Sequence, residues 1–462
     1  MSKIQVDTAQ KYQVIESFGV SGAWWAQSAG GWTEPDEAAS GLSKRERIAQ
    51  LLFDKEKGIG ISAYRYNLGA GSMNSGAGRY SVETRRAESF DISDTEYDWS
   101  RDANAVWMLR EAVRLGVREV IFFANSPPER MTKNHKAYQD YVGQTNLAKK
   151  NYDRFAAYCL DVTEHFIKEG IPVAYLSPVN EPVWFWLEKQ EGCHYRPWQV
   201  RGVMKAFARA MDRRPALKGL KLSGAENGDI RWFNKTYCRV MLNDETIRRK
   251  IDAIDTHSYC IKAPVPFINN RLAYMRRYKK WMDRHYPGVP LKTSEWTHMR
   301  GGRDYGMDSA LEQAKVMCED LTVMDVASWQ LWIALSDVDF CDGLIYQFHD
   351  TRTYRLTKRY FAFGNFSKYI PLGGRRVSAV PEDPSLMAVA FEKAGEVALL
   401  VVNPTESAKT VSLRAGKAAG KMYVTSDADD LEAYDIDLER ISLSPRSIST
   451  ICYACGGMEQ RA

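Results

Sequence analysis

The feature that most constrains the fold is a regular alternation of two kinds of segment, which runs from about residue 14 to residue 371. Short runs rich in apolar and β-branched residues take turns with longer stretches of helical periodicity. Strict strand–helix alternation predicts parallel strands joined by right-handed crossovers. The predicted strands are 14–25, 60–69, 119–126, 173–180, 219–227, 253–260, 291–296 and 341–347. Eight such units favour a closed (β/α)8 barrel of the TIM type over an open sheet.

The segments between these runs have the period of amphipathic helices. The clearest are 43–57, 103–115, 151–169, 267–285 and 310–327. No G-x-G-x-x-G follows an early strand, which argues against a dinucleotide-binding sheet.

The pattern changes after residue 371. Strand-like runs follow at 387–392, 397–403, 410–414, 422–426 and 447–453, without helical periodicity between them. This predicts an attached all-β sandwich side domain. The alternating run 3–7 predicts an edge strand of the same sandwich. We therefore expect a barrel over 17–371 and a sandwich built from 1–16 and 372–462.

Charge and hydropathy exclude two classes of partner. The 63 Lys and Arg residues are nearly balanced by 58 Asp and Glu residues, and no one-sided basic block suggests nucleic-acid binding. No segment approaches the roughly 18 apolar residues of a membrane span. The first residues lack the apolar core of a signal peptide, so we expect a cytoplasmic protein, or a secreted one if a signal peptide was removed. Oligomeric state has no sequence signature here.

Cysteine and histidine spacing argues against a metal centre. The eight cysteines are scattered, which predicts reduced thiols, and Cys452-x-x-Cys455 is one pair without a second. The seven histidines form no H-E-x-x-H motif, and no G-x-S-x-G elbow indicates a serine hydrolase. We predict no metal and no cofactor.

Functional residues of such a barrel project from the carboxyl ends of its strands. These ends are polar, aromatic and acidic, which favours one shared site over a set of unrelated solvated loop residues. The candidates are Arg65, Asn125, Asn180, Glu181, Glu226, His257, Tyr259, Glu295 and Trp296.

Two glutamates stand out among these candidates. Glu181 follows the fourth predicted strand, where Pro182 ends the strand, and Glu295 ends the seventh. The fourth and seventh strand ends face each other across a barrel mouth. Two carboxylates about 5–5.5 Å apart serve a double displacement at a sugar's anomeric carbon, one as nucleophile and the other as acid and base. The 13 Trp and 24 Tyr residues provide surfaces on which a carbohydrate substrate can stack.

The remaining candidates have one or two interpretations each. Tyr259 is placed to donate a hydrogen bond to Glu295. His257 is either a residue of the site or a core histidine whose ring nitrogens are hydrogen-bonded, and the sequence favours neither interpretation. Arg65 either lowers the pKa of a nearby glutamate or only ties strands together. Asn180 is placed to bind a sugar hydroxyl. Glu226 has a supporting or substrate-binding role, or forms a structural ion pair.

These residues lie in motifs that resemble glycoside hydrolase family 30. The similar segments include Glu16-Ser17-Phe18-Gly19, Tyr64-Arg65-Tyr66-Asn67, Ala124-Asn125-Ser126-Pro127-Pro128, Asn180-Glu181-Pro182, Ser294-Glu295 and residues 360–371. The resemblance implies a barrel with a sandwich formed from both chain ends. It also implies Glu181 as acid/base, Glu295 as nucleophile, and substrate or support roles for Arg65, Asn180 and Tyr259.

Within the family, the chain looks most like the endo-β-1,6-galactanase branch. The segments that carry this likeness are 125–132, 190–195, 329–336, which contains the candidate Trp332, and 342–346. Glucosylceramidase-like members have Trp where Pro128 stands. Glu129 and Arg130 replace a frequent aromatic residue, so we expect a different stacking surface.

The expected substrate is β-1,6-galactan or its oligosaccharides, although other identities remain open. A basic group after the last predicted barrel strand, namely Arg352, Arg355, Lys358 and Arg359, either reads an acidic sugar, as in the glucuronoxylanase branch, or forms a solvated loop. The alternatives are a β-glucosidase, β-1,6-glucanase, β-xylosidase or glucuronoxylanase, and a non-catalytic carbohydrate-binding protein on a degenerate barrel.

Overall fold

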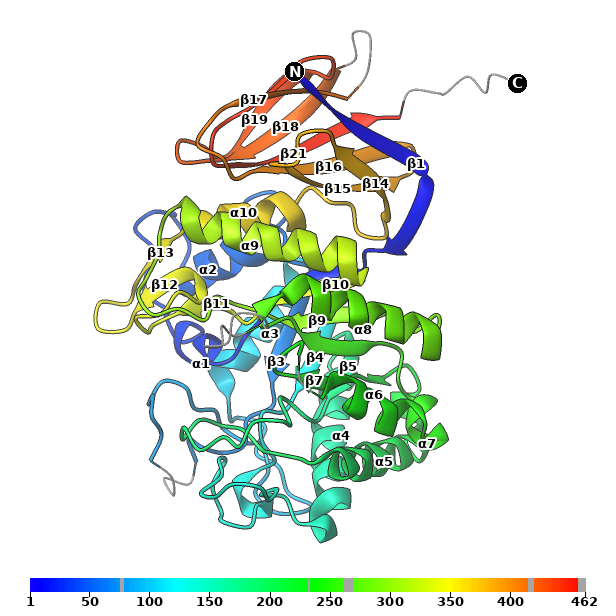
Figure 1. Ribbon diagram of the computed structural model, residues 1–462. Coiled ribbons are helices and arrows are strands. Elements are labelled where there is room, and N and C mark those ends of the chain that lie inside the picture. The colour runs from blue at the N-terminus through cyan, green and yellow to red at the C-terminus, as the bar shows by residue number, and fades with distance from the viewer. Residues whose placement is uncertain (75–78, 232, 261–268, 414–418, 456–462) are drawn as a thin grey trace.

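The computed structural model describes residues 1–462 apart from 75–78, 232, 261–268, 414–418 and 456–462. A barrel of strands and helices carries a separate layer of mostly antiparallel strands on one side (Figure 1). The fold is therefore the predicted (β/α)8 barrel with an attached all-β sandwich side domain.

The barrel is a ring of parallel strands. Its members are β2 (Ser17–Ser21), β3 (Ala63–Asn67), β4 (Glu119–Phe123), β5 (Val173–Ser177), β6 (Lys221–Leu222), β7 (Ala225–Asn227), β8 (Ile254–His257), β9 (Leu291–Glu295) and β10 (Ser328–Leu331). The order is β6-β5-β4-β3-β2-β10-β9-β8-β7. Because β6 and β7 are two halves of one interrupted strand, the ring has eight members, with Glu181 after the fourth and Glu295 on the seventh.

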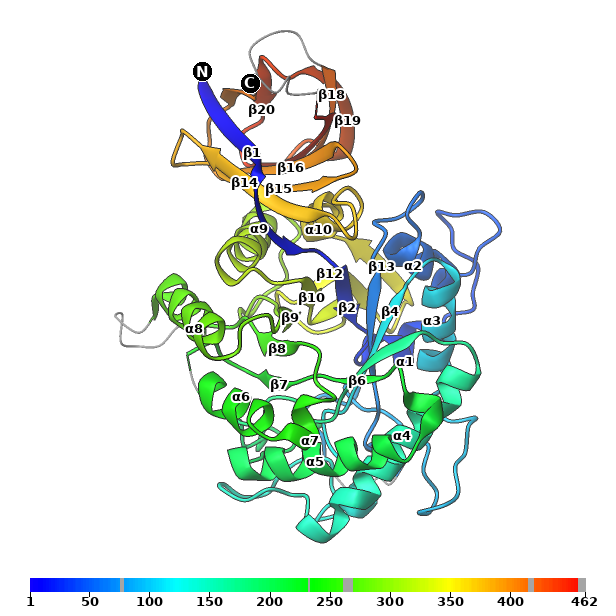
Figure 2. The same cartoon turned by 90° about the vertical axis from the view of Figure 1, so that its right-hand side faces the viewer.

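Helices surround this ring and cover its outer face (Figure 2). They are α1 (Trp25–Ala29), α2 (Lys44–Phe53), α3 (Ala103–Arg114), α4 (Tyr152–Lys168), α5 (Pro197–Asp212), α6 (Asn234–Leu242), α7 (Glu245–Arg248), α8 (Arg271–His285), α9 (Met307–Glu319), which continues as the π-helical η5 (Asp320–Met324), and α10 (Lys358–Ser367). Helices α2, α3, α4 and α8 fall within predicted stretches, whereas α9 begins before its predicted stretch and α5 lies in none of the stretches named. Residues 267–268 of one prediction lie outside the described residues.

The prediction of the eighth barrel strand was wrong. That place belongs to β10, which pairs with β2 and β9. The predicted run contributes β12 (Gly343–Phe348) to a small sheet with β11 (Ile333–Ser336) and β13 (Thr353–Leu356). The run at β10 contains polar residues that hide its buried position, and the buried Ser328 satisfies its hydroxyl by a 2.8 Å contact with Ser17 Oγ.

The side domain is a single nine-stranded sheet that folds over a core of its own. It contains β1 (Ser2–Val14), β14 (Arg375–Pro381), β15 (Met387–Lys393), β16 (Glu396–Asn403), β17 (Lys409–Ser412), β18 (Ala419–Thr425), β19 (Asp430–Asp437), β20 (Ile441–Leu443) and β21 (Ser447–Ala454). The predicted edge position of the N-terminal run was wrong, because β1 pairs with both β14 and β17. The division into a barrel over 17–371 and a sandwich over 1–16 and 372–462 stays a proposal.

Helices α9 and α10 lie between the barrel and this sheet (Figure 1). Asn365 on α10 joins the two layers: its Nδ2 donates to Tyr423 O at 2.9 Å, and its Oδ1 accepts from Thr425 Oγ1 at 2.7 Å. Thr450 Oγ1 also donates to Asn365 O at 2.8 Å. Tyr369 stacks on Tyr423 with 3.7 Å between ring centroids. These contacts fix the sheet against the barrel.

In the part of the chain that the structure describes, no disulfide joins any of the cysteines. Among the described residues, no helix has both the length and the apolar character needed to cross a bilayer.

Candidate active site

A cavity of about 510 Å³ lies at the carboxyl ends of the barrel strands. Residues that end or follow six of these strands contribute to its wall. They are Asn125 after β4, Glu181 after β5, Gly228 after β7, Tyr259 after β8, Glu295 on β9 and Trp332 after β10. The cavity is therefore built where the barrel architecture predicts a site.

Glu181 is held at the rim by its backbone and by one side-chain contact. It has a left-handed φ of 42°, and its N–H donates to Glu226 O at 2.8 Å. The side chain points into the cavity, where Oε1 lies 2.8 Å from His257 Nδ1. The tight turn before Pro182 thus directs this carboxylate toward the barrel axis.

Glu295 is buried at the end of β9 and accepts hydrogen bonds on both oxygens. Arg65 Nη1 donates to its Oε2 at 2.6 Å, and Tyr259 Oη donates to its Oε1 at 3.2 Å. Burial raises the pKa of Glu295, against the opposing effects of His257 and Arg65. A fixed carboxylate with raised basicity is suited to attack an electrophilic carbon.

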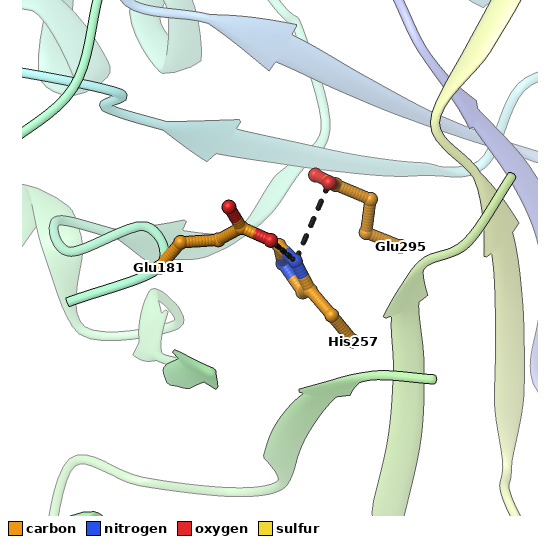
Figure 3. Close-up of side chains that lie close together, drawn as sticks. All are labelled: Glu181, His257 and Glu295. Carbon is orange, nitrogen blue, oxygen red and sulfur yellow. Dashed lines mark hydrogen bonds and ion pairs between the residues drawn. The ribbon is translucent and has the colours of Figure 1, made fainter. Parts of the chain in front are cut away.

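His257 connects the two glutamates (Figure 3). One oxygen of Glu181, one oxygen of Glu295 and a ring nitrogen of His257 all lie within 4.8 Å of one another. Burial acts to lower the pKa of His257, but the surrounding carboxylates outweigh it and raise the pKa to about 10. The ring is therefore protonated at neutral pH and donates from Nδ1 and Nε2. In this protonated state Nδ1 donates to Glu181 and faces Glu295, so the three residues form one hydrogen-bonded group.

A second layer lies beneath the two glutamates. Glu226 Oε2 lies 2.9 Å from His257 Nε2 and 3.3 Å from Arg65 Nη2, and it accepts from Ser294 Oγ. Burial acts to raise the pKa of Glu226, but Arg65 and His257 stabilise the charged form and lower the pKa to about 2. Arg65 and Glu226 are both fully buried, so this charged layer supports the site from behind.

A chain of amides continues from Arg65 along the wall. Arg65 Nη2 donates to Asn180 Oδ1 at 2.9 Å, and Asn180 Nδ2 donates to Asn125 Oδ1 at 3.0 Å. Asn125 Nδ2 in turn donates to Asn67 Oδ1 at 3.1 Å. These bonds fix Asn125 and Asn180 where they line the cavity.

The two candidate tryptophans differ in position. Trp332 lines the cavity and packs edge-on against Trp24 with 5.4 Å between ring centroids. Trp296 lies behind the wall, where its ring contacts those of His298 and Trp329.

The ten sequence-predicted residues thus form two groups. Those in the cavity wall are Asn125, Asn180, Glu181, Tyr259, Glu295 and Trp332. Those behind it are Arg65, Glu226, His257 and Trp296, whose predicted contact with substrate stays a prediction.

Sequence reasoning missed several wall residues. Trp184 and Trp186 follow Glu181 within five positions, so the aromatic pair beside a strand-end glutamate was an available signal. Arg85 and Asp342 also line the cavity and form an ion pair at 3.1 Å. Because 257 positions separate them, no local pattern reveals this pair.

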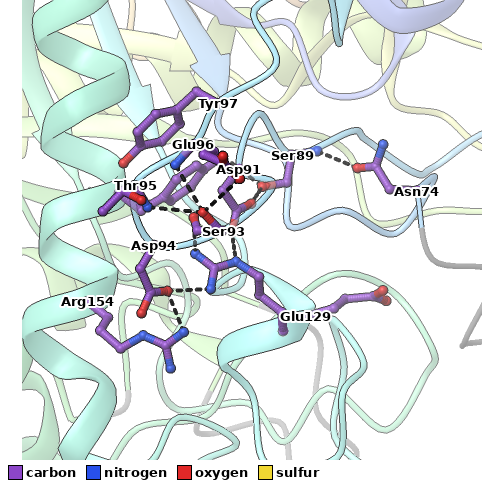
Figure 4. Close-up of polar contacts among 12 residues, drawn as sticks. Asn74, Ser89, Asp91, Ser93, Asp94, Thr95, Glu96, Tyr97, Glu129 and Arg154 are labelled. Atoms are coloured by element: carbon purple, nitrogen blue, oxygen red, sulfur yellow. Dashed lines mark hydrogen bonds and ion pairs between the residues drawn. The ribbon is translucent and has the colours of Figure 1, made fainter.

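Glu129 and Arg130 do not belong to the described cavity wall, and the predicted change of the stacking surface stays a prediction. Glu129 is buried and accepts from Tyr80 Oη at 2.5 Å. Arg130 pairs with Asp91 and Asp94, and Asp94 also pairs with Arg154 (Figure 4). Both charged residues therefore fix the loops outside the cavity wall.

The basic residues near α10 also have other contacts. Arg352 pairs with Glu34, and Lys358 with Asp430 at 2.8 Å. Arg355 lies over the Tyr305 ring, and the buried Arg359 donates to Cys341 O at 2.7 Å. None of the four belongs to the described cavity wall, so the acidic-sugar interpretation of this group finds no support.

A barrel that delivers two carboxylates from its fourth and seventh strands to one sugar-sized cavity has the architecture of an O-glycosyl hydrolase. The sequence profile of O-glycosyl hydrolase family 30 matches residues 1–346, and the chain belongs to this family.

Individual relatives are similar to this chain over most of its length. An endo-β-1,6-galactanase of Hypocrea rufa is 25% identical over 445 residues, which cover 91% of this chain and 85% of the relative. A conserved exported protein from Bacteroides fragilis superimposes with a TM-score of 0.86 at 23% identity, covering 97% of this chain and 100% of the other. The catalytic domain of the family 30 xylanase C from Talaromyces cellulolyticus superimposes with a TM-score of 0.73 at 17% identity, covering 98% of this chain and 100% of the other. The two structural likenesses concern the fold.

Proposed function

We propose that this family 30 member is a retaining β-glycosidase that cleaves β-1,6-galactan or its oligosaccharides by double displacement. The observation that carries the proposal is the approach of Glu181 and Glu295, whose nearest described oxygens lie within 4.8 Å in one cavity. Retaining enzymes need this short separation because the nucleophilic carboxylate itself reaches the anomeric carbon. In inverting enzymes the two carboxylates lie further apart and leave room for the attacking water molecule.

In the first step, a Glu295 oxygen attacks the anomeric carbon and the glycosidic bond breaks. Arg65 and Tyr259 hold the nucleophile by hydrogen bonds of 2.6 and 3.2 Å. Glu181 gives its proton to the departing oxygen. Its Oε1 accepts from His257, so Oε2 is the oxygen that carries the proton.

In the second step, Glu181 takes a proton from water, and the resulting hydroxide attacks the glycosyl–Glu295 ester. The bond between the sugar and Glu295 breaks, which restores the carboxylate. Two inversions give net retention at the anomeric carbon.

The galactan substrate is supported by the 25% identity to an endo-β-1,6-galactanase over most of both chains. It is also supported by the aromatic wall residues Trp184, Trp186 and Trp332, which offer stacking faces for pyranose rings.

The chemistry is tested with aryl β-glycosides and with Glu295→Ala, Glu181→Ala and Glu439→Ala. Glu439 is exposed on the side domain and lies outside the described cavity wall, so Glu439→Ala is the matched control for loss of a carboxylate. We expect Glu295→Ala to lose activity by about 10⁴-fold or more and Glu439→Ala to stay within about threefold. Azide should restore the activity of Glu181→Ala and give a β-glycosyl azide as product. In the wild-type protein, a 2-fluoro glycoside should label Glu295 covalently. Equal rates for wild type and Glu295→Ala would refute the mechanism.

The substrate is tested by product analysis on β-1,6-, β-1,4- and β-1,3-linked oligosaccharides. We expect β-1,6-linked galactose oligomers to be cleaved fastest. Cleavage only of glucose- or xylose-based oligomers would keep the mechanism and replace the sugar. Binding of oligosaccharides with no cleavage of any would instead identify a carbohydrate-binding protein.

A further inference from the structure

One wall of the cavity is formed by an ion pair between two loops. Arg85, in the loop that follows β3, donates from Nη2 to Asp342 Oδ2 at 3.1 Å. The exposed fraction of the side chain is 19% for Arg85 and 2% for Asp342, and both line the cavity. Thr297 Oγ1 donates to Asp342 O at 3.0 Å, which fixes the acid between two loops. The pair is therefore a built part of the wall.

The pair is attached to the aromatic part of the same site. The Arg85 guanidinium lies 5.9 Å from the centroid of the Trp24 ring, and Trp24 packs edge-on against Trp332. A sugar that stacks in the cavity thus meets Trp332 and the ion pair together.

The charges of the residues that line the described wall are one-sided, because the cations Arg65 and His257 lie behind the wall and are already paired with Glu226, Glu295 and Glu181. Arg85 is its cation, whereas its acids are Glu181, Glu188, Glu295, Asp339 and Asp342. A uronate that enters such a cavity loses water and needs a cation in exchange. The available guanidinium is already neutralised by Asp342.

We propose that the Arg85–Asp342 pair makes this site selective for neutral sugars over uronic acids. The remaining N–H groups of Arg85 donate to hydroxyl groups of the sugar ring, and the Asp342 carboxylate accepts hydrogen bonds from the same hydroxyl groups. Asp342 occupies the place at which the carboxylate of a uronate would pair with Arg85. This inference rests on the proposed glycosidase function and adds the class of sugar and the residues that select it.

The experiment compares kcat/KM for two matched pairs of nitrophenyl glycosides: β-galactoside with β-galacturonide, and β-glucoside with β-glucuronide. Wild type should prefer the neutral member by about 10²-fold or more. Asp342→Asn keeps the shape of the side chain and frees Arg85 from its ion pair. The preference for the neutral glycoside should therefore fall about tenfold or more, because kcat/KM for the uronide rises. Arg85→Gln should lose activity on the neutral glycoside without gaining on the uronide.

The double variant Arg85→Gln/Asp342→Asn should show no uronide gain, because the freed cation is absent. The matched control is Asp430→Asn, which breaks the Lys358–Asp430 pair outside the cavity wall and should leave the preference unchanged. A preference in Asp342→Asn within about twofold of wild type would overturn the proposal. An equal gain in the double variant would do the same.

Binding provides a readout that does not depend on turnover or on the folding of Asp342→Asn. In thermal-shift titrations of Glu295→Gln, galactose should stabilise the protein at concentrations about 10²-fold lower than galacturonate does. Equal stabilisation by the two sugars would overturn the proposal. Cleavage of neutral glycosides with no selectivity would reject this inference alone, whereas absence of any cleavage would reject the proposed function.

Discussion

The close approach of Gly228 to Glu181 gives a sharp test of how the acid/base residue is positioned. A Cβ atom added at Gly228 would lie 2.6 Å from Glu181 Oε1 and 2.2 Å from Trp184 Nε1. Both distances are below any that real Cβ atoms show, so Gly228→Ala must displace one or both side chains.

The size of the displacement follows from these distances. Ordinary contact begins at 3.4 Å, so the Glu181 carboxylate has to move by about 0.8 Å. The affected oxygen is the one that lies 2.8 Å from His257 Nδ1, so this bond is lost or lengthened. A misplacement of about 1 Å costs about 10²-fold in rate, or about 2.7 kcal/mol of transition-state stabilisation.

The assay compares a glycoside with a poor leaving group, which needs a proton from Glu181, with a dinitrophenyl glycoside, which does not. We expect kcat/KM of Gly228→Ala to fall about 10²-fold on the first substrate and less than about tenfold on the second. The control is Gly219→Ala, because an added Cβ at Gly219 meets no atom within 4 Å. Thermal unfolding of both variants separates a positional effect from loss of fold.

Rates of Gly228→Ala within about threefold of wild type on the poor substrate would refute the reasoning. Equal losses on both substrates would also refute it, because they would show that the displaced group is not the proton donor.

Three further predictions concern charge and packing. Because the pKa of His257 is raised from 6.5 to about 10, its protonation stabilises the fold fully below pH 6.5, and this contribution disappears as the pH rises toward 10. The difference in unfolding free energy between wild type and His257→Gln, measured by denaturant titration, should therefore shrink between pH 6.5 and pH 10. A difference that stays constant over this range would contradict the prediction. Arg65→Lys replaces the planar guanidinium, which donates to both Glu295 and Asn180, with a single ammonium charge. We expect kcat to fall about 10²-fold with KM nearly unchanged, and a change in KM alone would argue against a positioning role for Arg65. Asn365→Ala removes the side-chain bonds to Tyr423 and Thr425 and should lower the unfolding free energy by about 2–4 kcal/mol; a loss below about 1 kcal/mol would show that this contact contributes little.

The fold was predictable because its signal is local. The period of apolar residues within each segment distinguishes strands from helices, and counting segments placed Glu181 after the fourth strand and Glu295 on the seventh. The error at the eighth strand came from the same source. The polar Ser328 and Gln330 hide β10, and their partners are brought close only when the ring closes.

The sequence by itself therefore determined the order of elements and the two glutamates that the ring directs toward one mouth. Only the tertiary structure decided that β1 lies inside its sheet, that His257 is protonated among three carboxylates, and that Arg85 pairs with Asp342. The physical reason is the range of the interactions. Helical and strand periods involve neighbours a few positions apart, whereas pKa shifts and ion pairs depend on groups that chain closure brings together from distant loops.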